Sequence, residues 1–285
     1  APRISKQCLC GGSVVNAVTI KRRGFDLPPM DLSERPRPED FDLVKSERAR
    51  FGFLPVGANI LAPGSYNSKL ARSGLCWSCS LLPARLSGVN LCTSSTPECR
   101  RHCLNLAGKG GLDTVQRGRG WRASLLVNHP ETFGRLLAQE LRDIRRRTGR
   151  RSWGLRLNVL QDVDWRPWAD QLREAAGPRC RPWDYTKRPD TLGDSWRHVV
   201  YSASQERETV DSVRAIVNGG HSVAVVARDL KKSEEVPRFI WGLPAVDGDL
   251  SDRRDLDRFT GPRGGKRSAG VVVLRPKGSL RREAA

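Results

Sequence analysis

The chain has 285 residues, and its 50 lysines and arginines exceed its 31 aspartates and glutamates, which gives a formal net charge of +19. A hydrophobic fraction of 38% is enough to form a core, so the composition excludes a disordered or fibrous protein. No apolar run approaches the roughly 20 residues that cross a bilayer, so we expect no membrane span and a cytoplasmic protein. Forty of the basic residues are arginines, which indicates a GC-rich genome as well as a possible phosphate-binding surface.

The first 66 residues show no sustained hydrophobic period. Prolines interrupt them repeatedly, and charges of both signs are mixed between residues 31 and 50. This pattern is typical of an irregular, poorly ordered leader. We therefore predict a leader over residues 1–66 and a single domain over residues 67–285.

Beyond the leader, apolar segments alternate with turn signals. The clearest segment is 130–148, where apolar side chains recur on one helical face between Pro130, suited to a first turn, and Gly149, suited to a stop. Further helices are predicted over 165–176 and 206–218, and strands over 153–159, 181–186, 198–203, 222–227, 243–246 and 270–275. This alternation predicts an α/β fold with mainly parallel strands, in a complete or partial (β/α) barrel; an open doubly wound sheet is the structural alternative.

Five of the eight cysteines are crowded into 28 residues, in a chain expected to occupy a reducing compartment. They are Cys76, Cys79, Cys92, Cys99 and Cys103. At these spacings, thiolates can converge on one soft metal or cluster. Zinc would take four ligands, for instance the first two cysteines and two of the others, with His102 as a substitute. An iron–sulfur cluster on the last three would leave one iron open, and buried free thiols are the third interpretation.

Polar side chains follow the predicted strands, where the loops of a parallel β/α fold form one rim. The candidate catalytic residues at these positions are Asn158, Asp162, Tyr185, Lys187, Asp247 and Asp249. Lys187 is a candidate general acid, amine nucleophile or phosphate clamp, or else a solvated loop lysine. The acidic run from Asp247 to Asp257 would bind a divalent cation, hold one carboxyl of raised pKa, or pair with neighbouring arginines.

A basic stretch surrounds the segment 130–148. Its candidate nucleic-acid-binding residues are Arg117, Arg119, Arg122, Arg146, Arg147 and Arg150. The helix dipole accounts for part of the positive charge at the end of the segment, but the arginines there exceed what a helix end requires. Trp121 and Trp153 flank the stretch, and they either stack on bases or belong to the core. Nucleic acid is therefore the macromolecular partner that the charge indicates.

Several strings of the sequence resemble bacteriophage proteins of the gene-product-88 type. The strings are Gly-Val-Asn-Leu-Cys ending at Cys92, Pro-Glu-Cys-Arg-Arg-His-Cys ending at Cys103, Ala-Gly-Lys-Gly at 107–110, Arg-Leu-Asn-Val at 156–159, Asp-Tyr-Thr-Lys at 184–187, Tyr-Ser-Ala-Ser at 201–204 and Asp-Gly-Asp at 247–249. The resemblance covers residues 69–278. It implies a phage protein that works in the host cytoplasm.

The loop with Cys92, Cys99 and Cys103 is also similar to that of radical S-adenosylmethionine enzymes, in which three cysteines hold a [4Fe–4S] cluster. The spacing differs, because it is C-x6-C-x3-C here and usually C-x3-C-x2-C. The resemblance implies an iron–sulfur enzyme that uses S-adenosylmethionine on nucleic acid or a nucleobase derivative. Two alternatives stay open: a non-catalytic, zinc-stabilised nucleic-acid-binding protein, and a zinc-dependent base-modifying barrel with an aspartate nucleophile.

Overall fold

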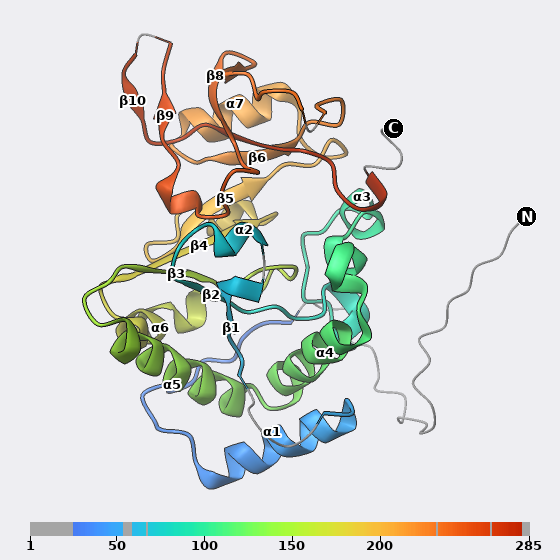
Figure 1. Cartoon of the computed structure of the whole chain (residues 1–285), viewed down its shortest axis with the longest axis vertical. Helices are drawn as coiled ribbons and strands as arrows, with labels where there is room; N and C mark the ends of the chain where they lie inside the picture. Colours follow the sequence, from blue (N-terminus) through green and yellow to red (C-terminus); the bar gives the residue numbers. More distant parts are fainter. Residues whose placement is uncertain (1–24, 54–58, 67, 232, 263, 281–285) are drawn as a thin grey trace, which may run out of the picture.

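A nine-stranded, mainly parallel sheet forms the centre of the protein (Figure 1). The computed structural model describes residues 25–53, 59–66, 68–231, 233–262 and 264–280. In spatial order the strands are β1 (Ala62–Pro63), β2 (Cys76–Ser78), β3 (Trp153–Arg156), β4 (Cys180–Thr186), β5 (His198–Ser202), β6 (Val223–Val226), β11 (Val271–Leu274), β8 (Leu243–Asp247) and β7 (Phe239–Ile240). A separate hairpin pairs β9 (Phe259–Thr260) with β10 (Lys266–Arg267).

The sheet is open. The strands from β2 to β8 are parallel to their neighbours, whereas β1 and β7 pair antiparallel at the two edges. No pairing among the described strands joins these two edges. The expected α/β fold with mainly parallel strands is therefore confirmed, and a complete barrel is not formed.

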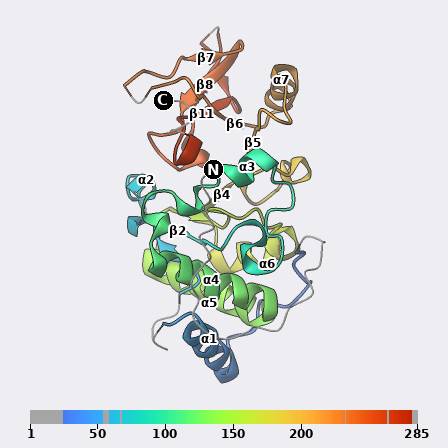
Figure 2. The same cartoon turned by 90° about the vertical axis from the view of Figure 1, so that its right-hand side faces the viewer.

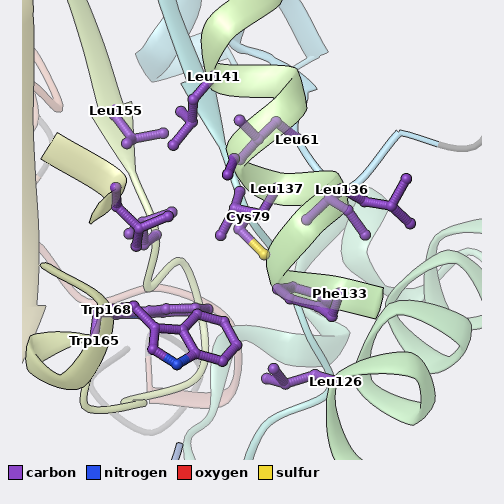
Figure 3. Packing of buried hydrophobic residues seen from close by; sticks show 14 of the residues in the cluster. Leu61, Cys79, Leu126, Phe133, Leu136, Leu137, Leu141, Leu155, Trp165 and Trp168 are labelled. Atoms are coloured by element: carbon purple, nitrogen blue, oxygen red, sulfur yellow. The ribbon is translucent and has the colours of Figure 1, made fainter. Parts of the chain in front are cut away.

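Seven α-helices lie in the described part of the chain. They are α1 (Pro38–Arg50), α2 (Ser68–Ala71), α3 (Pro97–Arg101), α4 (Asp113–Asn128), α5 (Pro130–Thr148), α6 (Ala169–Ala176) and α7 (Val210–Asn218). The buried faces of α4, α5 and α6 pack with β3 in the main core. Figure 3 shows Phe133, Leu137 and Leu141 of α5 turned toward Leu155 of β3 and toward Trp165 and Trp168.

The two faces of the sheet have different covers, and side-chain alternation in the strands explains the difference. In β11, Val271 and Val273 pack with α7, whereas Val272 packs with Phe259 on the opposite face. Under the same opposite face, Trp183 of β4 lies against Arg253, whose guanidinium is 5.4 Å from the ring centroid. The longer helices therefore cover one face of the sheet, and the short helix α2 and the segment from 251 to 259 cover the other.

The strongest sequence signals are confirmed. The helix expected over 130–148 is α5, with Pro130 in its first turn, and the chain leaves it through Gly149 at a φ of +59°. The expected strands all form, with ends that differ by one to three residues, and α7 begins four residues later than expected. Sequence reasoning missed α4, because its Gly118 and Gly120 lower the helical propensity. Gly120 is required there, since a Cβ would lie 2.5 Å from the Phe51 ring.

The expectation of an irregular leader is wrong for the part of residues 1–66 that the structure describes. Residues 38–50 form α1, and Leu32 and Val44 are buried in the main core. The carboxylate of Asp40 anchors α1 to α5 through Arg135 at 2.7 Å and Thr132 at 2.6 Å. The hydrophobic periodicity of the sequence did not reveal this helix, because its buried side chains are mostly polar. Residues 1–24 lie outside the described residues.

No described helix combines the length and the apolar character that crossing a membrane requires.

Candidate functional site

The three cysteines of the expected cluster lie near the carboxyl ends of β3 and β4. Cys92 is buried; its Sγ accepts the Ala84 N–H at 3.2 Å and donates to the Leu160 carbonyl, in the loop after β3, at 3.6 Å. Cys99 lies on α3, whose N-cap Thr96 accepts the Cys99 N–H at 3.1 Å. Cys103 directly follows this helix. A loop and a short capped helix thus bring the three thiols to one region.

Burial and neighbouring charges control the ionisation of Cys92 and Cys99. Burial, with the charges of Asp162, Cys99 and Cys103, raises the pKa of Cys92 to about 12, although the hydrogen bond from the Ala84 N–H opposes the rise. Burial also raises the pKa of Cys99, whereas the nearby ammonium of Lys187 opposes this rise. Among the described residues, no three histidine, cysteine or acidic side chains are close enough to hold a single metal ion. The three cysteines thus lie in one region, without a single-ion site among the described residues.

Lys187, at the end of β4, lies close enough to Cys99 for its charge to oppose the rise in the pKa of this thiol. Its Nζ donates to the Ser202 carbonyl at 2.7 Å and lies 3.4 Å from the Ser202 Oγ, at the end of β5. Burial lowers the pKa of the amine, and the negative charges of Cys99 and Glu208 act in the opposite direction. The structure thus brings Lys187 and the cysteines together, which gives a nucleophilic or proton-donating amine beside the thiols.

Asp162 connects the cysteine loop to β4. Its backbone N–H donates to the Leu91 carbonyl at 2.9 Å, next to Cys92. Its carboxylate accepts the Thr186 hydroxyl at 2.8 Å and the Lys187 N–H at 2.9 Å. Burial raises the pKa of this carboxyl, and the two hydrogen bonds oppose the rise. Asp162 therefore belongs to the same region as the thiols and fixes the backbone from which Lys187 projects.

Sequence reasoning missed Glu98, which closes the site on the side of β5 and β6. Its carboxylate pairs with Arg228, at the end of β6, and accepts the Ser204 hydroxyl at 3.1 Å. Ser204 is also 3.2 Å from the Thr96 hydroxyl. The sequence signal for Glu98 was its place between Pro97 and Cys99, in the first turn of α3, the helix that carries Cys99.

The contacts of two other candidate residues, Asn158 and Tyr185, are those of residues that support the fold. Asn158 is 2% exposed, and its Oδ1 accepts the Val163 N–H and the Trp165 indole N–H, so the side chain shapes the loop after β3. The ring of Tyr185 lies on the opposite face of the sheet, beneath the guanidinium of Arg156 at 4.9 Å. Burial raises the pKa of Tyr185, and its hydroxyl has no partner among the described residues.

The acidic run at the end of β8 forms ion pairs. Asp247 meets Arg275 at 2.8 Å, and Asp249 meets Lys69 and Lys277, each at 2.8 Å. Although burial opposes ionisation, these ammonium groups hold the pKa of Asp249 well below its usual range. Further ion pairs along the run are Asp252–Arg156, Asp255–Arg253 and Asp257–Arg254. Burial nevertheless raises the pKa of Asp257 to about 6. The geometry therefore fits the interpretation of paired carboxylates, and Asp257 also fits that of one carboxyl with a raised pKa.

The candidate nucleic-acid-binding arginines separate into two groups. Arg117, Arg119 and Arg122 of α4 donate to the backbone carbonyls of Gly52, Asn105 and Asn59, respectively. Arg146 and Arg147 lie in the last turn of α5, and Arg150 follows it; these three side chains are exposed. Trp121 and Trp153, which were candidates for stacking on bases, are 1% and 0% exposed and belong to the core.

The first two cysteines of the crowded segment are separate from the other three. Cys76 packs with Leu70 and Trp183, whereas Cys79 lies in the main core beside α5 (Figure 3). Burial raises the pKa of both thiols, to about 11 and about 12. His102 Nδ1 is 3.0 Å from the Ser279 hydroxyl. The placement of Cys76 and Cys79 thus does not form the four-cysteine arrangement that zinc would take.

Comparison with known proteins gives one match. A model of the family described as gene product 88 matches residues 58–284, which include the whole sheet and the three-cysteine loop but not α1. No curated protein and no solved structure matches the chain.

Proposed function

We propose a function for this chain on the premise that it belongs to the gene product 88 family, as its resemblance to bacteriophage proteins of that type predicted. The chain is a radical-S-adenosylmethionine-like enzyme whose Cys92, Cys99 and Cys103 bind a [4Fe–4S] cluster. Its substrate is nucleic acid or a nucleobase derivative. The observation that carries the proposal is the convergence of the three thiols with Lys187 near the carboxyl ends of β3 and β4.

The residues around the thiols fit such a cluster. The ammonium of Lys187 opposes the rise in the pKa of Cys99. Burial lowers the pKa of Arg119, and the negative charge of Cys103 opposes this change. Positive charge therefore lies beside the thiolates. Three cysteines would leave one iron open, and the bound cluster would supply one-electron reduction of S-adenosylmethionine.

The strand order supports an active site at this edge. Strands β2 to β6 follow one another in chain order, as strands do along one side of a (β/α) barrel, and the rim of such a fold holds catalytic groups. Lys187 would bind an anionic substrate group or donate a proton from Nζ. Asp162 would hold the backbone of Lys187, and Glu98 would hold Arg228 toward the same region.

Metal analysis after anaerobic purification tests the proposal. We expect about four irons and four sulfides per chain, and a brown colour that is lost on exposure to air. A double replacement of Cys99 and Cys103 by alanine should remove the iron. Cys180→Ala is the matched control, because Cys180 is buried at the start of β4, away from the three thiols, and this variant should keep the iron.

Two outcomes would contradict the proposal. One is a folded, colourless protein that binds no iron even after anaerobic reconstitution with iron and sulfide. The other is stoichiometric zinc whose removal by a chelator unfolds the protein, because this would instead support the zinc-stabilised alternative.

A further inference from the structure

A cleft of about 600 Å³ lies between the segment that leads into α1 and the outer side of α5. Four arginines line it, together with an aromatic ring and a proline: Arg35, Arg142, Arg145, Arg146, Phe41 and Pro36. No acidic side chain lines it among the described residues. In Figures 1 and 2, α1 lies at the opposite end of the molecule from β7 and β8, whereas α3 with its cysteines lies nearer the middle. The cleft is therefore separate from the candidate functional site.

Contacts between its walls hold the cleft in shape. The Arg142 guanidinium donates to the carbonyls of Leu32 and Glu34, at 3.4 and 3.5 Å, which keeps the segment before α1 against α5. Asp40 fixes the start of α1 to α5. Burial opposes its ionisation, but hydrogen bonds from Arg135 and Thr132 lower the pKa of this carboxyl to about 2. The position of the two walls is thus set before any ligand binds.

The positive charge of the cleft is only partly compensated. Asp143 meets Arg146 at 2.5 Å, and Arg145 donates to the Glu174 carbonyl at 3.2 Å. Arg35 is exposed and forms no ion pair with a described residue. The nearest carboxylate in sequence, Glu34, pairs with Arg37 at 2.7 Å instead. Guanidinium groups that face a concave surface without carboxylate partners suit phosphate oxygens, which they bind in a planar, bidentate manner.

The aromatic ring specifies which phosphate ligand fits. Phe41 is 49% exposed although it is a large apolar residue, and it lies in the wall opposite α5. An exposed ring among arginines offers a base a stacking surface beside the groups that bind its phosphate. A duplex keeps its bases stacked internally, so it has no free base for this ring.

We propose that this cleft binds single-stranded nucleic acid, with phosphates on Arg35, Arg142 and Arg145 and a base on Phe41. The binding does not depend on an iron–sulfur cluster. Arg35 and Phe41 lie outside the residues that match the family, whereas α5 lies within them.

Fluorescence anisotropy of a labelled oligothymidylate of about 15 nucleotides, titrated with the full chain, tests the proposal. We expect an affinity that falls steeply as salt rises, because phosphate contacts release counterions. A double charge reversal, Arg35→Glu with Arg145→Glu, should weaken binding by tenfold or more and reduce the salt slope. Phe41→Ala should weaken it roughly five- to tenfold and leave the salt slope unchanged.

Lys266→Glu with Arg267→Glu is the matched control, because both side chains are exposed on β10, far from the cleft, and this double reversal changes the net charge by the same amount. All the replaced side chains are exposed, and thermal melting of each variant checks that it folds. An equal loss of affinity in the control would overturn the proposal. So would equally tight binding of heparin or of a duplex, unaffected by Phe41→Ala, because either result would indicate a general attraction to polyanions.

Discussion

The cysteine site and the acidic run both place ionisable groups at the carboxyl ends of strands, but they treat charge in opposite ways. In the run that follows β8, each of five aspartates meets an arginine or a lysine. In the cysteine site, the carboxylate of Asp162 meets a hydroxyl and a backbone N–H, and the amine of Lys187 meets a carbonyl and a hydroxyl. Among the described residues, neither of these two groups forms an ion pair.

This difference separates structural charges from candidate functional ones. A compensated pair lowers the cost of burying its members and leaves them nothing further to bind. A half-buried charge without an opposite partner keeps a shifted pKa, which is typical of groups that act on a ligand. By this criterion, Lys187 and Asp162 are the stronger catalytic candidates, and Asp247 and Asp249 are the weaker ones.

The largest expected change in stability comes from breaking an ion pair of the acidic run, and it tests whether these pairs support the fold. Asp252→Ala would leave Arg156 buried without its partner at 2.6 Å, and we expect it to lower the free energy of unfolding by about 3–5 kcal/mol. Denaturant titration measures this change. Asp42→Ala, which removes the exposed pair with Lys45, is the matched control and should change stability by about 0.5 kcal/mol or less. Equal effects of the two replacements would contradict the distinction.

The sequence predicted the fold best where apolar periodicity determines the element. The face of α5 and the strands β3, β4, β5, β6, β8 and β11 carry that signal, and the structure has them close to the expected positions, whereas the two-residue strands β7, β9 and β10 were not predicted. It failed for α1, whose buried Asp40 and Glu47 give no apolar stripe. It also failed for closure of the barrel, because closure depends on whether strands distant in the sequence pair with each other. Instead, β1 and β7 end the sheet at its two edges, each paired antiparallel with a strand nearby in the sequence.

The candidate site was predictable only in part. Spacing alone brought Cys92, Cys99 and Cys103 together as candidates. Spacing could not distinguish the surroundings of Asp162 from those of Asp247. Asp162 accepts the backbone N–H of Lys187 after β4, whereas Asp247 pairs with Arg275, which is 28 residues away in the chain. Similarly, arginines that donate to backbone carbonyls look the same in the sequence as arginines that line a cleft.

A smaller change in stability is expected when Lys187, whose amine forms no ion pair with a described residue, is replaced. Lys187→Met removes a buried charge, at the loss of a hydrogen bond to the Ser202 carbonyl, and we expect stability at pH 7 to stay the same or rise by about 1 kcal/mol. The pH dependence carries the clearer signal. Because burial lowers the pKa of Lys187 below 10.5, the unfolded chain binds more protons just below that pH, and folded stability rises as pH approaches 10.5. Urea titrations at several pH values should show this slope in the wild type but not in the variant.

The smallest expected effect concerns Asp162. Asp162→Asn preserves the shape of the side chain: the amide oxygen can accept the Lys187 N–H, and the amide nitrogen can donate to the Thr186 hydroxyl oxygen. We expect a change of less than about 1 kcal/mol in stability at pH 7. Burial raises the pKa of the carboxyl above 3.8, so the folded protein retains this proton longer than the unfolded chain, and stability falls as pH rises from 3.8 through the folded-state pKa. The asparagine variant should lack that loss. An identical pH profile in the two proteins would show that the carboxyl is as well compensated as those of the acidic run, and it would remove the distinction between the two regions.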